Sequence, residues 1–299
     1  MSAIQSDERK RLTIPHGLRY LRMPEPLSVR PVAGRAEFRR FIDYAYDRNA
    51  ADPHWVAPLR IAEHERLTPK KNPFFEHAAV ELFLARRGDR IVGRIAAIDD
   101  ELHNATHREN TAMFGFFEAE DGDAAAALLG TVDAWARARG RARVRGPINP
   151  SLNESAGLLI DGFDTDPMLM MPHNPPEYAS HIEAAGYTKA KDLYAWLYQL
   201  EAEAPPAIVK LAARLRDKHG ITVRPLNLAE FTREVERLRV IYSAVWDRNW
   251  GFVPPTPAEF RRIATGTIVA ALRNAPAIGT IIELYRIRMS RRPACAAKK

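Results

Sequence analysis

Two apolar runs separated by a three-residue break constrain the fold of this chain more than any other feature. The runs cover residues 79–86 and 90–98, and Arg87-Gly88-Asp89 lies between them. A short break with a glycine between two apolar runs is typical of a β-hairpin. A third apolar run follows at 112–118. The centre of the molecule is therefore predicted to be a sheet of at least three strands.

Helical patterns occur on both sides of this strand group. Residues 123–139 are rich in Ala and Leu, and Leu128, Val132 and Trp135 recur at the spacing of one helical face. Further strands are predicted at 27–33, 143–146 and 190–200, and further helices at 35–49 and 175–185. Because strands and helices alternate along the chain, the sequence predicts an α/β fold.

The length of 299 residues predicts two domains of ordinary size. The segment 221–226 (Ile-Thr-Val-Arg-Pro-Leu) repeats the pattern of 27–32 (Leu-Ser-Val-Arg-Pro-Val), and a helix is predicted after each. The predicted organisation is an N-terminal extension at 1–26, a first domain at 27–200, a helical connector at 201–220, a partial second unit at 221–264 and a divergent basic tail at 265–299.

The charge and cysteine content bear on location and partners. The net charge is +7, and residues 285–299 carry six Arg or Lys and no acid, so the rest of the chain is nearly neutral. This distribution argues against a nucleic-acid partner. No run approaches the roughly 20 apolar residues of a membrane span. The single cysteine, Cys295, allows no intrachain disulfide, which favours a reducing compartment. A soluble, cytoplasmic protein is predicted.

Eight short motifs, taken in order, carry a resemblance to a known family. They are Asn-Pro-Phe-Phe-Glu-His-Ala at 72–78, Val-Gly-Arg-Ile-Ala-Ala-Ile at 92–98, Phe-Gly-Phe-Phe-Glu at 114–118, Arg-Gly-Pro at 145–147, Gly-Leu-Leu-Ile-Asp-Gly-Phe at 157–163, Asn-Pro-Pro-Glu-Tyr at 174–178, Lys-Ala-Lys-Asp-Leu-Tyr at 189–194 and Asn-Trp-Gly-Phe-Val-Pro at 249–254. From about Val29 to Ile263 the chain resembles the GNAT (GCN5-related N-acetyltransferase) superfamily, and in particular a bacterial group of uncharacterised tandem-GNAT-like proteins.

The resemblance implies a mixed, mostly antiparallel twisted sheet flanked by helices. It also implies an acyl-CoA-dependent N-acyltransferase, with acetyl-CoA or another acyl-CoA as co-substrate and a small-molecule or peptide amine as acceptor. Such chemistry needs a base for the amine proton and an acid for the departing thiolate.

Two residues are the candidates for these roles. Glu118 ends the strand where the family keeps a general base, although its place before a helix is better explained by an acidic residue that complements the helix dipole. Tyr178 is the candidate acid. The family's tyrosine falls four residues before Gly186, where this chain has Ile182, and Tyr178 lies one turn earlier on the same face. The alternative for Tyr178 is packing between helix and sheet.

The chain departs from the family at its phosphate-binding loop. Where that loop is expected, residues 118–123 read Glu-Ala-Glu-Asp-Gly-Asp, and the match at 137–142 (Arg-Ala-Arg-Gly-Arg-Ala) ends a helix, so its amides point away from a phosphate. In similar proteins the loop follows the segment that corresponds to 249–254. We interpret the chain as a C-terminally shortened form, whose residues 265–299 are either native or the product of a frameshift.

Three further groups of residues each have a functional and a structural interpretation. Asn149, Ser151, Asn153, His173 and Asn174 are candidates for binding substrate at the open end of the sheet, or for satisfying turns. His77, His103 and His107 are better explained as surface or hydrogen-bonded histidines than as metal ligands, so no metal is predicted. Met168, Met170 and Met171 would line an apolar pocket or fill a core.

Three classes of function therefore remain open. The first is an N-acyltransferase, and the second is a non-catalytic binding or assembly protein on a GNAT scaffold. The third is a nucleotide phosphohydrolase that would hold Mg²⁺ with Glu118, Glu120, Asp121 and Asp123. A homodimer is also expected, because a half-built sheet with an open edge favours a partner.

Overall fold

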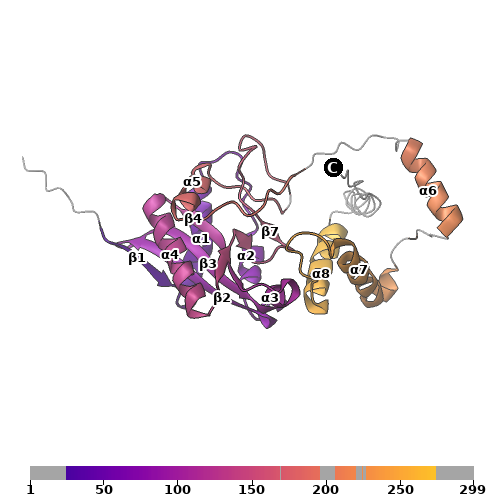
Figure 1. Cartoon of the computed structure of the whole chain (residues 1–299), viewed down its shortest axis with the longest axis horizontal. Coiled ribbons are helices and arrows are strands. Elements are labelled where there is room, and N and C mark those ends of the chain that lie inside the picture. The colour runs from indigo at the N-terminus through magenta and orange to yellow at the C-terminus, as the bar shows by residue number, and fades with distance from the viewer. Residues whose placement is uncertain (1–24, 169, 196–205, 220–223, 225–226, 274–299) are drawn as a thin grey trace, which may run out of the picture.

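A five-stranded sheet forms the centre of the computed structural model, which describes residues 25–168, 170–195, 206–219, 224 and 227–273 (Figure 1). The strands are β1 (Leu27–Pro31), β2 (Ala78–Arg87), β3 (Arg90–Asp100), β4 (Thr111–Ala119) and β5 (Arg143–Arg145), and they lie in this order across the sheet. Every pairing is antiparallel except that of β4 with β5. The mixed, mostly antiparallel GNAT-like sheet is confirmed.

The predicted hairpin is the pair β2 and β3. Arg87 pairs with Arg90, which leaves Gly88 and Asp89 as the two-residue turn. Gly88 has a φ of 58°, a conformation that glycine adopts without a steric penalty.

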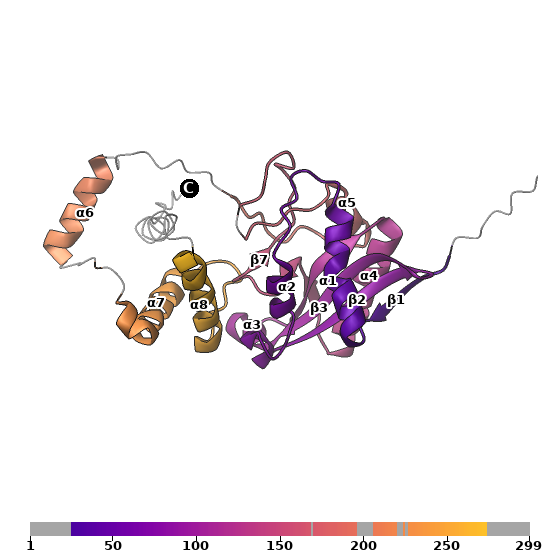
Figure 2. The same ribbon diagram turned by 180° about the vertical axis from the view of Figure 1, so that it is seen from behind.

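Helices cover both faces of the sheet. α4 (Gly122–Ala138) and α5 (Glu177–Ala184) lie on one face, whereas α1 (Gly34–Asn49) and α2 (Arg60–Arg66) lie on the other (Figures 1 and 2). Residues of each strand alternate between the two cores, so that Ile95 packs with α4 and Ala96 with α1. Both faces are thus buried, which explains why these strands read as nearly continuous apolar runs.

A bulge interrupts β4 next to its centre. Ala96 pairs with Gly115 and Arg94 with Glu118, so Phe116 and Phe117 together lie opposite Ile95. Phe116 has a φ of 51°, which is rare for a residue with a side chain. The extra residue turns Glu118 to the α1 face of the sheet.

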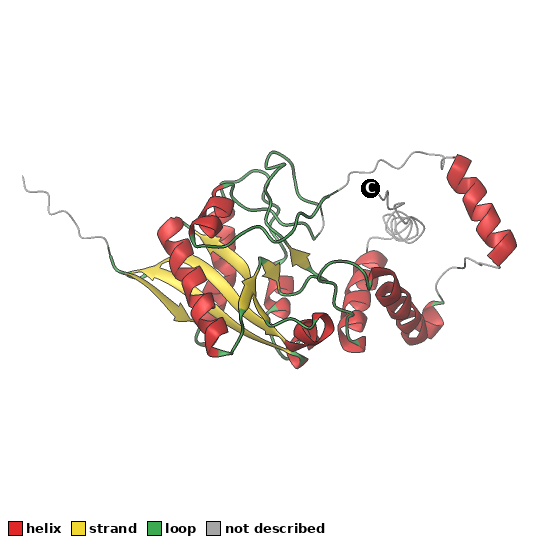
Figure 3. Ribbon diagram, in the orientation of Figure 1, coloured by secondary structure: helices red, strands yellow, loops and turns green. Residues whose placement is uncertain are grey.

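Short elements complete the domain, and Figure 3 separates them from the loops. They are the 3₁₀ helix η1 (Pro73–Glu76), α3 (Glu101–His107) and the two-stranded sheet of β6 (Ile148–Asn149) and β7 (Ser155–Ala156). The sequence did not predict α2, β6 or β7.

The predicted final strand at 190–200 is wrong over the residues that the structure describes. Residues 190–195 have no regular secondary structure, and 196–200 lie outside the described residues. Leu193 and Tyr194 are exposed. No strand of the described residues pairs with this segment, and a local β pattern without such a partner is not sufficient to form a strand.

After the sheet and its flanking helices, the described part of the chain forms α6 (Pro206–His219), α7 (Phe231–Trp246), which is preceded by the 3₁₀ helix η2 (Leu228–Glu230), and α8 (Pro257–Arg273). The segment before α8 is fixed to the first domain, since His107 donates to the carbonyl of Phe252 and Asn153 to that of Val253. Phe252 and Val253 are buried.

Several predictions fall outside the described residues. They concern the N-terminal extension up to residue 24, most of the repeated strand at 221–226, and the basic tail from residue 274, including Cys295. Within the described part of the chain, none of the helices has the length and apolar character needed to cross a membrane.

Candidate functional site

Glu118 and Tyr178, the two residues proposed for acid–base chemistry, are in direct contact. The Tyr178 hydroxyl donates a hydrogen bond of 2.8 Å to Glu118 Oε2. Glu118 lies near the end of β4 and Tyr178 in the first turn of α5. Their exposed fractions are 9% and 1%, so the contact is buried.

The incomplete pairing of β4 explains how α5 reaches this point. β5 pairs with β4 only from Thr111 to Met113, and no other described strand pairs with the later part of that edge. The Ala119 amide donates to the Tyr178 hydroxyl at 3.0 Å instead. Tyr178 also packs edge to face on Phe117, with ring centroids 5.0 Å apart. Tyr178 thus accepts a hydrogen bond from β4 that a neighbouring strand would otherwise accept.

Arg48 of α1 binds the carbonyl of the same residue, Ala119. Its Nε donates to the carbonyl of Ala119 at 3.2 Å, and its Nη2 pairs with Glu177 at 3.0 Å. Its guanidinium lies 5.9 Å from the centre of the Tyr178 ring. Helices from opposite faces of the sheet therefore meet at the end of β4.

Arg94 of β3 provides the opposite charge nearest to Glu118. Arg94 Nη2 lies 3.8 Å from Glu118 Oε1, and its Nη1 donates to the carbonyl of Phe41 at 3.0 Å. Burial raises the pKa of the Glu118 carboxyl, while Arg94 and hydrogen bonds from Tyr178 and Asn49 oppose part of that rise. A carboxyl with a raised pKa is suited to accept a proton near neutral pH.

The acidic residues after Glu118 are bound by arginines of the β2–β3 hairpin. Asp121 accepts from Arg87 at 2.5 Å and also caps α4 by accepting from the Ala124 amide at 2.9 Å. Glu120 forms an ion pair with Arg90. Along the described chain, no group of three or more His, Cys, Asp or Glu side chains is arranged to hold a metal ion.

Two of the five predicted substrate-binding residues support the backbone. Asn149 Oδ1 accepts from the Phe116 amide at 2.6 Å, so it binds the amide that the β4 bulge leaves unpaired. Asn174 accepts from the amide of Leu159 and donates to the carbonyl of Pro175. These contacts match the alternative that the residues satisfy turns.

The other three do not all meet, since Ser151 and Asn153 line one small hollow and His173 does not line it. Asn153 donates to the carbonyl of Val253 at 2.9 Å, His173 lies 2.8 Å from Asp52, and the Ser151 carbonyl accepts from the Glu154 amide. No hydrogen bond joins any two of the five in the described chain. The structure therefore does not bring them together at one point.

The three histidines considered as metal ligands have other partners. His103 and His107 stack with ring centroids 4.7 Å apart. The hydrogen-bonding or ion-pair partners are Glu109 for His103, the carbonyl of Phe252 for His107, and both Asp100 and Glu259 for His77.

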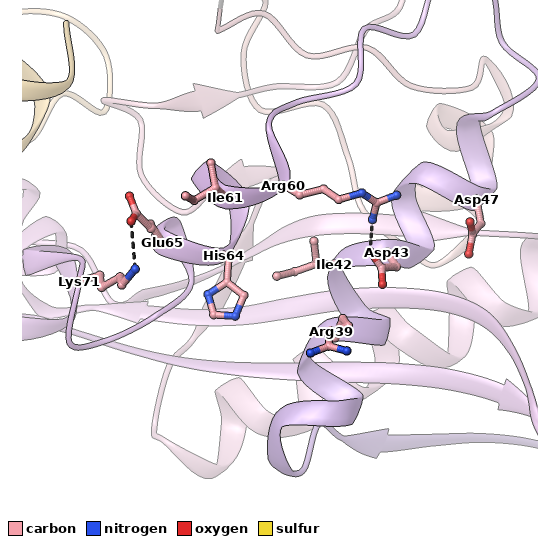
Figure 4. A pocket seen from close by; sticks show the side chains of 9 residues that line it. All are labelled: Arg39, Ile42, Asp43, Asp47, Arg60, Ile61, His64, Glu65 and Lys71. Atoms are coloured by element: carbon pink, nitrogen blue, oxygen red, sulfur yellow. Dashed lines mark hydrogen bonds and ion pairs between the residues drawn. The ribbon is translucent and has the colours of Figure 1, made fainter. Parts of the chain in front are cut away.

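A hollow that the sequence did not predict lies between α1 and α2. Its volume is about 640 Å³, and Figure 4 shows its side chains. The lining residues are Arg39, Ile42, Asp43, Asp47, Arg60, Ile61, His64, Glu65 and Lys71. Ion pairs join Arg60 to Asp43 and Lys71 to Glu65. Neither Glu118 nor Tyr178 lines it. Because α2 was not predicted, no sequence signal indicated this hollow.

The strand order and the helices on both faces of the sheet define a GNAT-like α/β domain. No protein-family model matches the chain. The chain is 43% identical over 240 residues to a protein of Caulobacter vibrioides (strain NA1000 / CB15N) named bacterial ceramide synthase, a match that covers 80% of this chain and 62% of that protein. It is 39% identical over 234 residues to Protein YghO of Escherichia coli (strain K12), covering 78% of this chain and 59% of that protein.

The chain spans about three fifths of the length of these curated relatives. Among solved structures, a tandem GNAT protein from the clavulanic acid biosynthesis pathway (without AcCoA) matches with a TM-score of 0.36 and 17% identity, over 72% of this chain and 66% of that one. The GNAT-like fold is assigned from the strand order of the chain itself.

Proposed function

We propose that the protein is an N-acyltransferase that moves a fatty acyl group from coenzyme A to the amine of a long-chain amino alcohol. The observation that carries the proposal is the 43% identity over 240 residues with a protein named bacterial ceramide synthase. A ceramide is the amide that such a transfer would form. An acyl-CoA donor and an amine acceptor are also what the resemblance to GNAT proteins implies.

The chemistry requires a proton acceptor. An alkyl amine is mostly protonated at neutral pH, so its proton must leave before the nitrogen can attack the thioester carbonyl. The C–N bond then forms and the C–S bond breaks, and the second proton that the nitrogen loses as the amide forms reaches the departing CoA thiolate through water. Glu118 is the proposed base, because burial raises the pKa of its carboxyl.

Two loops supply an apolar surface for the hydrocarbon parts of such substrates. Val56, Leu59 and Ile61 lie on or beside one loop, and Ile160, Met168, Met170 and Met171 lie on the other; all seven are exposed. His54 contacts Asp166 at 2.9 Å and His173 contacts Asp52 at 2.8 Å, so the loops are held against each other. The exposure of the methionines argues against a core-filling role.

The test is direct synthesis. Purified protein is incubated with a long-chain amino alcohol and with acyl-CoA donors from acetyl to palmitoyl, and the amide is detected by mass spectrometry. We expect amide from the long donors and its loss in Glu118→Gln. Glu183→Gln, an exposed carboxylate of α5, is the matched control. If the folded wild-type protein forms no amide with any donor, the proposed function is wrong.

A second candidate, a non-catalytic GNAT scaffold, is favoured by the residues between β4 and α4. Asp121 and Glu120 lie where the resemblance places the loop for the CoA pyrophosphate, and they pair with Arg87 and Arg90, the cations that a phosphate there would otherwise attract. Thermal unfolding with acyl-CoA distinguishes the candidates. Binding at a hundredfold excess over Kd stabilises a protein by about 2.7 kcal/mol, whereas a scaffold without a donor site would show no shift.

A further inference from the structure

We propose that Tyr178 is a positioning residue for Glu118, and that Glu118 Oε1 is the atom that receives the amine proton. The inference rests on the proposed function, and it assigns Tyr178 a role other than the acid implied by the resemblance. It follows from the hydrogen bonds at the end of β4.

The Tyr178 hydroxyl has no proton free for a substrate. A phenol carries one proton and accepts through its oxygen lone pairs. Its proton goes to Glu118 Oε2 at 2.8 Å, and its oxygen accepts from the Ala119 amide at 3.0 Å. To protonate a thiolate, Tyr178 would have to release Glu118 during the step in which Glu118 acts as base.

A phenolate at this position would also be costly. Tyr178 is 1% exposed, and the loss of its proton would place a second negative charge beside the Glu118 carboxylate. Burial, followed by the charge of Glu118, raises the pKa of Tyr178 far above its ordinary value. A hydroxyl in this setting keeps its proton throughout the working pH range.

Glu118 Oε1 is the oxygen with capacity to receive a proton. It lies 3.8 Å from Arg94 Nη2, which is longer than a hydrogen bond but close enough for attraction between charges. Arg94 is itself held by the carbonyl of Phe41. Oε2 is meanwhile bound by Tyr178, so the carboxylate cannot rotate freely.

Charged and polar groups from three elements face the Glu118 carboxyl. Arg94 comes from β3, Tyr178 from α5, and Asn49 and Arg48 from α1. Each of these groups stabilises the ionised form of Glu118, whereas burial favours its neutral form. Removing the Tyr178 hydroxyl should therefore raise the pKa of Glu118. A hydrogen bond to a charged group has a typical strength that corresponds to a shift of about one to two pH units.

The experiment compares wild type, Tyr178→Phe, Arg94→Lys and Tyr187→Phe. Tyr187 is the matched control, because its partly buried hydroxyl donates to the carboxylate of Asp133 at 2.7 Å, outside the proposed site. The pKa of Glu118 is measured by NMR titration of protein labelled with ¹³C in the glutamate carboxyl, and Glu118→Gln identifies the signal. The rate of amide formation is then followed against pH.

We expect Tyr178→Phe to raise the pKa of Glu118 and to move the acidic limb of the rate profile to higher pH by the same amount, with the plateau rate kept within about threefold. Arg94→Lys, which keeps the charge, should move the limb less. A hundredfold fall of the plateau with an unshifted acidic limb would assign Tyr178 as the acid and overturn the inference.

The two proposals can fail separately. If no variant makes amide, the proposed function fails, while the NMR titration still tests whether Tyr178 sets the pKa of Glu118. An unchanged Glu118 pKa in folded Tyr178→Phe overturns the positioning role. If Tyr178→Phe does not fold, the same titration of Arg94→Lys and Asn49→Ala decides whether the surrounding groups hold Glu118 ionised.

Discussion

The imidazole of His77 lies 3.3 Å from the carboxylate of Glu259, and this ion pair joins the first domain to helix α8. The other ring nitrogen of His77 lies 2.9 Å from Asp100, at the end of β3. Burial alone would lower the pKa of His77, but the hydrogen bonds and charges of Asp100 and Glu259 outweigh it and raise the pKa to about 10. A protonated histidine therefore lies between two carboxylates.

This arrangement predicts a pH dependence. Because the pKa of His77 is raised in the folded state, its stabilising contribution is fully present below about pH 6.5, the unfolded value. It is lost as pH rises toward 10. The midpoint of thermal unfolding, measured from pH 6 to 10, should exceed that of His77→Gln at low pH and approach it at high pH. A difference that stays constant with pH would contradict the assignment.

Gly115 is predicted to tolerate no side chain. A Cβ at this position would lie 1.8 Å from the carbonyl oxygen of Ile148, which is backbone and cannot rotate away. Gly115→Ala should lower the free energy of unfolding by about 1–3 kcal/mol.

Gly130 of α4 gives the matched control, because the space around its Cβ position is open and it lies inside a helix. Gly130→Ala should stabilise the protein by roughly 0.5–1 kcal/mol. Urea unfolding measures both variants. Equal effects of the two substitutions would show that the close approach of β4 to β6 is not rigid.

Phe252 is predicted to fix α7 and α8 to the first domain. It is buried, packs against Tyr242 with ring centroids 5.5 Å apart, and its carbonyl accepts from His107. Phe252→Ala should make local opening of these helices easier by about 3–5 kcal/mol. Amide hydrogen exchange should then speed up in α7 and α8 but not in β3. Val245→Ala, at an exposed position on α7, should leave exchange unchanged.

The apolar loops are predicted to select for long hydrocarbon chains. Leu59 is 74% exposed and Met168 63%, so neither supports the core. Covering such a side chain with hydrocarbon contributes about 1.5–3 kcal/mol. Leu59→Ser with Met168→Ser should lower kcat/KM for palmitoyl-CoA at least tenfold more than for acetyl-CoA. Val240→Ser on α7 is the control. An equal loss for both donors would exclude chain-length selection by these loops.

Local sequence patterns predicted an element correctly where neighbouring residues set both its secondary structure and its buried face. The β2–β3 hairpin, β4 and the apolar face of α4 were all predicted, because each forms around its own turn or periodicity and each is buried by the others. Glu118 and Tyr178 became candidates through the resemblance to GNAT proteins, which implies a base at the end of this strand and an acid on the helix before Gly186.

The sequence determined the five strands of the sheet and the helices α1, α4 and α5 that pack on it. Only the tertiary structure decided that Tyr178 hydrogen-bonds to Glu118, which is 60 residues earlier in the chain. It also decided that Asn149 accepts a hydrogen bond from the Phe116 amide in the β4 bulge, and that residues 190–195 form no strand. These outcomes depend on which backbone groups remain unpaired once the sheet is assembled. That is a property of contacts between distant segments, and no local pattern of residues encodes it.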